Sequence, residues 1–171
     1  MAVVRDAQLG LRAVDLGATL LQLRDPDASV RELEREAVRL VAEASVPVVI
    51  NARVDLALAV GAAGAHLPEA DLSVAAARRL LGADRLVGRS VHSVPAALEA
   101  AVQGADYVVF GPVFASPTHP GQPPAGLESL REVARAVTIP VLAIGGVDAT
   151  RAIACMEAGA AGFAAIGYFG G

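Results

Sequence analysis

The chain has 171 residues, of which 54% are hydrophobic and 19% are charged, with a formal charge of −4. This length suits one domain, residues 1–171. All 14 basic residues are arginines, and the absence of lysine excludes Schiff-base catalysis, a P-loop lysine and a lysine general base. The mild negative charge predicts no nucleic-acid partner, and the lack of a long apolar run and of a signal peptide predicts a cytoplasmic protein with no membrane partner.

One pattern recurs along the chain: an amphipathic stretch, a Gly-Ala pair and then a short apolar run. A glycine in this place typically ends a helix, and the apolar run indicates a buried strand. Helices are predicted at about 4–16, 29–45, 53–60, 73–82, 94–103, 127–137 and 148–158. The predicted strands are Thr19–Leu23, Val46–Ile50, Gly64–Leu67, Leu86–Val91, Tyr107–Val113, Val141–Ile144 and Gly162–Ile166.

Seven buried strands alternating with helices favour an α/β fold of the TIM type, a (β/α)₈ barrel, with the first strand and the last helix missing. A doubly wound open sheet is the alternative. Without a first strand, the strand that carries Gln22 would have an open edge. Either a homo-oligomer covers that edge or the chain is a truncated relative of a complete barrel.

Polar residues and glycines gather where the predicted strands end, which is where parallel barrels place their chemistry. Packing alone explains such a concentration poorly. The residues at these ends are Gln22, Arg24, Asn51, His66, Ser90, His92, Gly111, Gly145, Gly146 and Gly167.

Arg24 has two interpretations. Its planar guanidinium suits a bidentate clamp on an anion, with Gln22 pointing to the same side of the strand. Alternatively, Arg24 pairs at the surface with Asp25 or Asp27. The clamp is favoured.

Gly145 and Gly146 follow one strand and precede a helix whose expected N-cap is Asp148. Glycines let the backbone approach a phosphate, and amides at a helix start donate to it. Together with Gly167 at the end of the next strand, they match the phosphate site that barrels form after strands seven and eight.

His92 ends a strand and could act as a general acid or base, with Ser90 on the same strand face. Capping of the following helix is the alternative. His66 is expected to be structural, because Glu69 and Asp71 beside it lack a characteristic metal-ligand spacing. Cys155 is expected to be a core thiol.

Five stretches resemble the thiamine phosphate synthase superfamily, in order and over nearly the whole chain: Leu21–Arg24, Asn51–Ala59, Gly64–Leu67, Gly104–Val113 and Val141–Val147. The superfamily has two branches. The synthase joins a pyrimidine diphosphate to a thiazole phosphate using magnesium, and the TenI-like tautomerase aromatises the thiazole phosphate.

The chain departs from the synthase pattern in three places. Pro26 stands where the synthase has a lysine after Gln22 and Arg24, and His119 replaces a second lysine. Ala52 replaces one of two aspartates that hold magnesium, whereas Asp71 matches the other. Two of these changes remove a cation and one removes a magnesium ligand, and both kinds of group would stabilise the leaving pyrophosphate.

The resemblance implies that the thiazole phosphate half of the site is retained, and that the segment Gly88–Ser93 carries the tautomerase signature with His92 as its catalytic residue. The prediction is therefore a thiazole tautomerase, an isomerase without metal or cofactor, in which Arg24 and Gln22 bind the substrate carboxylate. The implied substrate-binding residues are Gln22, Arg24, Asn51, Ser90, Ser116, Thr118, Gly145, Gly146, Ile166 and Gly167.

Two alternatives remain. One is a thiamine phosphate synthase with a degenerate metal site, and the other is a non-catalytic or regulatory module that only binds thiazole phosphate.

Overall fold

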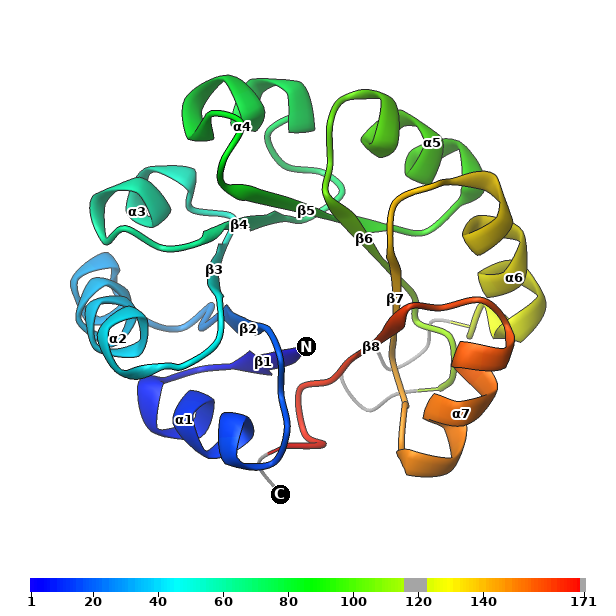
Figure 1. The fold of residues 1–171 in the computed structure, drawn as a ribbon, viewed down its shortest axis with the longest axis horizontal. Helices are drawn as coiled ribbons and strands as arrows, with labels where there is room; N and C mark the ends of the chain where they lie inside the picture. Colours follow the sequence, from blue (N-terminus) through cyan, green and yellow to red (C-terminus); the bar gives the residue numbers. More distant parts are fainter. Residues whose placement is uncertain (116–122, 170–171) are drawn as a thin grey trace.

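Eight parallel strands form a ring that is surrounded by helices in a computed structural model, which describes residues 1–115 and 123–169 (Figure 1). Strand and helix alternate from the first element to the last. The strands are β1 (Ala2–Val4), β2 (Leu21–Leu23), β3 (Val48–Asn51), β4 (Gly64–Leu67), β5 (Leu86–Val91), β6 (Tyr107–Phe110), β7 (Val141–Ile144) and β8 (Gly162–Ala164). The helices are α1 (Ala7–Asp15), α2 (Val30–Glu43), α3 (Val54–Ala59), α4 (Val74–Leu81), α5 (Val94–Val102), α6 (Gly126–Ala136) and α7 (Ala149–Glu157).

The ring closes between β1 and β8. Val3 N–H donates to the Ala165 carbonyl at 2.9 Å, and Ala165 N–H donates to the Met1 carbonyl at 3.1 Å. Ala2 and Ala165 form a parallel bridge, so the sheet order β1 to β8 returns to its start. The predicted TIM-type barrel is confirmed, and the open doubly wound sheet is excluded.

The prediction that the first strand is missing is wrong. Val3 pairs with Gln22 in parallel register, so β1 covers the edge of β2 that was expected to be open. A strand of three residues is too short to show a pattern, and the helix expected at about 4–16 includes its last residue, Val4. That helix begins later, because Asp6 is its N-cap and accepts a hydrogen bond from Leu9 N–H at 2.8 Å. The open edge that suggested a homo-oligomer is therefore absent.

The repeated Gly-Ala pair ends four of the helices in one way. Each glycine adopts a left-handed conformation, with φ from +68° to +100°, and donates to the carbonyl three residues earlier. The alanine that follows is buried and donates to the carbonyl five residues earlier, as in a Schellman motif. The four pairs are Gly17-Ala18, Gly61-Ala62, Gly104-Ala105 and Gly159-Ala160.

Two apolar clusters fill the structure. The larger one lies between sheet and helices and includes Cys155, which is buried as predicted. The smaller one lies inside the ring and contains Val3, Tyr107 and Val109, with Ile144 packed against it. Because this inner cluster is small, polar side chains also enter the ring. No helix among the described residues is long and apolar enough to cross a membrane.

Gly64 and Gly162 offer a matched test of the packing between strands, because both begin strands and neither has a positive φ. A Cβ on Gly64 would lie 1.9 Å from the Leu86 carbonyl oxygen of β5, whereas one on Gly162 would meet only the Leu142 side chain, at 3.5 Å. We expect Gly64→Ala to lower the free energy of unfolding by at least about 2 kcal/mol, since backbone must move. Gly162→Ala should change it by less than about 1 kcal/mol. Urea unfolding of both variants checks this, and equal stabilities would contradict the packing described.

Candidate active site

A cavity of about 770 Å³ opens where the strands end. Its volume lies within the usual range for a small-molecule site. Ser116 and Thr118, which the sequence also assigned to the substrate, and His119 lie outside the described residues. The other predicted site residues all line this cavity: Gln22, Arg24, Asn51, Ser90, His92, Gly145, Gly146, Ile166 and Gly167.

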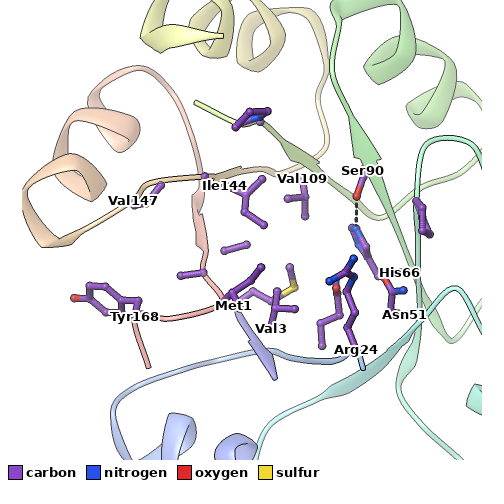
Figure 2. A pocket seen from close by; sticks show the side chains of 18 of the residues that line it. Met1, Val3, Arg24, Asn51, His66, Ser90, Val109, Ile144, Val147 and Tyr168 are labelled. Atoms are coloured by element: carbon purple, nitrogen blue, oxygen red, sulfur yellow. Dashed lines mark hydrogen bonds between the residues drawn. The ribbon is translucent and has the colours of Figure 1, made fainter. Parts of the chain in front are cut away.

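The cavity has two chemically different sides (Figure 2). Arg24, Asn51, His66 and Ser90 follow or belong to β2–β5 and form a polar side. Opposite them lie aliphatic side chains and glycine backbone from β6–β8, with Ile144 at the end of β7. A ligand with two charged ends separated by an apolar body would match this arrangement.

The glycine pair on the second side is required by its surroundings. Gly145 and Gly146 have φ of +95° and +62°. A Cβ on Gly145 would lie 2.6 Å from Pro112 Cβ, and one on Gly146 would lie 2.4 Å from the Ala115 carbonyl oxygen. Asp148 caps the following helix α7, as expected, by accepting from Arg151 N–H at 2.8 Å.

By contrast, a Cβ on Gly167 would meet no atom within 4 Å. Packing does not require glycine there, so its predicted contact with phosphate stays a prediction.

Arg24 does not pair with the aspartates that follow it. Asp27 instead accepts a hydrogen bond from Arg5, at 3.1 Å, and Arg5 also lines the cavity. None of the ion pairs between described residues includes Arg24. Two arginines thus line the cavity, Arg24 and the Asp27-paired Arg5, and the sequence pointed only to the first.

His92 forms a hydrogen bond with Glu69 that the sequence did not reveal. Its Nδ1 lies 2.6 Å from Glu69 Oε2, and its backbone N–H donates to Glu69 Oε1 at 3.2 Å. The imidazole is about half exposed and lines the cavity. His92 comes directly after β5 and Glu69 two residues after the neighbouring strand β4, and this shared position at the strand ends was the available signal.

His66 is buried, as expected for a structural histidine, and yet it reaches the cavity. Its Nε2 lies 2.9 Å from Ser90 Oγ, and its Nδ1 lies 3.3 Å from the Tyr107 hydroxyl. Burial, and secondarily the charge of Arg89, lower the pKa of His66 to about 3. The ring is therefore neutral at physiological pH.

The residues do not fit a metal ion held by several protein carboxylates. Ala52, at the end of β3, has no ligating oxygen in its side chain. Over the described ranges, no group of three His, Cys, Asp or Glu side chains is placed to hold an ion. Any magnesium near this cavity would depend on oxygens of the substrate itself.

Comparison with known proteins matches residues 5–169 to the family described as thiamine monophosphate synthase. A thiamine-phosphate synthase from Chloroflexus aurantiacus is 45% identical over 154 residues, which cover 88% of this chain and 71% of the relative. One from Caldanaerobacter subterraneus subsp. tengcongensis is 44% identical over 164 residues, covering 93% and 77%. Among solved structures, thiamine phosphate pyrophosphorylase from Pyrococcus furiosus matches with a TM-score of 0.85 and 33% identity, over 96% of this chain and 84% of that one.

These matches correct the predicted function. The superfamily assignment is confirmed, but the prediction of a TenI-like tautomerase, an isomerase, is wrong, because the relatives at 38–45% identity carry the name thiamine-phosphate synthase. Three residues, Pro26, Ala52 and His119, depart from the synthase pattern, whereas the likeness to synthases extends along about nine-tenths of the chain. The synthase alternative has the better support.

The low pKa of His66 predicts a specific dependence of stability on pH. Unfolded chains protonate this histidine near its ordinary pKa of 6.5, while the folded protein resists until about pH 3. Its contribution to stability is therefore complete above pH 6.5 and is lost as the pH falls toward 3, by up to about 1.4 kcal/mol per pH unit.

Urea unfolding of the wild type and of His66→Gln between about pH 4 and pH 7 checks this, because groups other than His66 contribute equally to both slopes. We expect a shallower slope for the variant. Parallel slopes would show that folding does not lower the pKa of His66. Titration of its ring signals by NMR gives the same answer if the variant fails to fold.

Proposed function

Since the chain belongs to the thiamine monophosphate synthase family, we propose that it joins a pyrimidine diphosphate to a thiazole phosphate, forming thiamine phosphate and releasing pyrophosphate. The observation that carries the proposal is the 38–45% identity to thiamine-phosphate synthases along about nine-tenths of the chain. We prefer this proposal to a module that only binds thiazole phosphate, because no separate observation favours that alternative.

The two sides of the cavity support a reaction between two substrates. We assign the diphosphate to the polar side, where Arg24 and Asn51 follow β2 and β3. We assign the thiazole phosphate to the opposite side, where Gly145 and Gly146 expose backbone after β7. Ile144 and Val109 line the apolar space between these ends, where two flat heterocycles would meet.

Positive charge on the polar side supports the departure of pyrophosphate. As the bond to the diphosphate breaks, negative charge grows on its oxygens, and fixed cations stabilise it. This chain has no lysine for that task, but Arg24 and Arg5 both line the cavity. A guanidinium binds phosphate oxygens in a bidentate way and stays charged at any physiological pH, so arginine supplies positive charge to this side without a lysine.

Arg24→Gln should lower kcat/KM for thiamine phosphate formation by roughly 10²- to 10³-fold, because it removes a preorganised cation from the leaving group. Arg24→Lys keeps the positive charge but loses the bidentate geometry of the guanidinium. Its kcat/KM should therefore lie between those of the wild type and Arg24→Gln. Arg39→Gln is the matched control, since Arg39 lies on α2 and pairs with Glu43 outside the cavity. The assay follows pyrophosphate release and thiamine phosphate in magnesium-containing buffer. A folded wild-type protein that forms no product from both substrates would overturn the proposed function.

Gly146→Ala should raise the KM for thiazole phosphate roughly 10-fold or more and leave the KM for the pyrimidine diphosphate nearly unchanged, because the added Cβ meets the Ala115 carbonyl on the phosphate side only. Steady-state kinetics with each substrate varied in turn make the measurement, with Gly162→Ala as the glycine control. An equal rise in both KM values would argue against separate sites for the two substrates.

A further inference from the structure

Three polar side chains form a continuous hydrogen-bonded chain across β4, β5 and β6. The Tyr107 hydroxyl lies 3.3 Å from His66 Nδ1, and His66 Nε2 lies 2.9 Å from Ser90 Oγ. Tyr107 and His66 are 5% and 3% exposed, whereas Ser90 is half-buried and lines the cavity. Figure 2 shows the His66–Ser90 hydrogen bond at the polar side. The chain therefore runs from the barrel interior to the substrate space.

Gly88 makes this arrangement sterically possible. It lies between His66 and Tyr107 in the register of the sheet, paired with both. A Cβ on Gly88 would lie 2.2 Å from Tyr107 Cζ and 2.6 Å from His66 Nδ1. Because that side chain is absent, the two rings stack with centroids 5.7 Å apart. The hydrogen bond between them therefore depends on glycine at position 88 of the sheet.

The direction of the hydrogen bonds follows from what each group can donate. Among the described residues, the one hydrogen-bond partner of the Tyr107 hydroxyl is His66 Nδ1. A buried hydroxyl proton without an acceptor is costly, so the phenol donates and Nδ1 accepts. A neutral imidazole then carries its proton on Nε2, which donates to Ser90 Oγ. Burial keeps both rings in these neutral forms, since it raises the pKa of Tyr107 and lowers that of His66.

We propose that Tyr107 is a positioning residue: through His66 it holds the Ser90 hydroxyl as a hydrogen-bond acceptor on its inner side, so that the Ser90 proton points into the cavity as a donor. Such a donor suits an anionic oxygen. The Ser90 hydroxyl cannot donate to His66 instead, because His66 Nε2 already carries a proton. The inference rests on the proposed function only for the identity of that oxygen, which belongs to the pyrimidine diphosphate. The reversed chain, with Nδ1–H donating to the phenol and Ser90 donating to Nε2, is the competing arrangement.

Nitrogen-15 NMR of the full chain tests the direction without any substrate. The protein has three histidines, and His66→Gln identifies the signals of His66 by their loss. We expect Nε2 protonated and Nδ1 unprotonated in the wild type. Tyr107→Phe should shift His66 toward the Nδ1-protonated form, while Tyr168→Phe, which changes the other tyrosine, should leave its tautomer unchanged. A wild-type His66 protonated on Nδ1 overturns the proposal whatever the enzyme's activity.

Kinetics test the consequence for substrate. Tyr107→Phe and Ser90→Ala should each raise the KM for the pyrimidine diphosphate roughly 3- to 10-fold, the effect of one net hydrogen bond. In the Ser90→Ala background, Tyr107→Phe should have no further effect, because its influence passes through that hydroxyl. Additive losses would mean that Tyr107 acts independently of Ser90 and would overturn the positioning role. If the expected tautomer is found but the protein forms no thiamine phosphate, the proposed function fails separately.

Discussion

Closure of the ring between β1 and β8 is the constraint on which the site depends. Two hydrogen bonds, from Val3 to Ala165 and from Ala165 to Met1, bring the end of β8 beside the start of the chain. Gly167, which follows β8, and Arg5, which follows β1, therefore line one cavity although they are far apart in sequence. In an open sheet these two edges would face away from each other, and no enclosed space would lie between a cationic side and a glycine side.

The sequence identified seven of the eight strands and about half of the residues that line the cavity, because parallel strands are continuously apolar and end in conspicuous polar residues. It missed β1, since three residues give no periodic signal. It also missed the contacts between strands, Glu69 with His92 and Tyr107 with His66. Those depend on register and on side-chain direction, which short buried strands do not encode in any local pattern.

Substitution of individual site residues proved a weaker guide to function than likeness along the chain. The absence of lysine and the alanine at position 52 suggested that synthase chemistry had been lost. The structure places Arg5, which follows the unpredicted strand β1, at the cavity as well. Residues from strands that are far apart in sequence therefore share one cavity, because a barrel directs every strand end to the same space.

Gly88 has a consequence for how this protein can change. Any larger residue there would displace either the histidine or the tyrosine beside it, since a Cβ alone would overlap both. The three positions are consequently interdependent: an ancestor with another residue at 88 would have needed different neighbours on β4 and β6. Few single substitutions should be tolerated at positions 66, 88 and 107. Homologues should therefore change these three residues together or keep all of them.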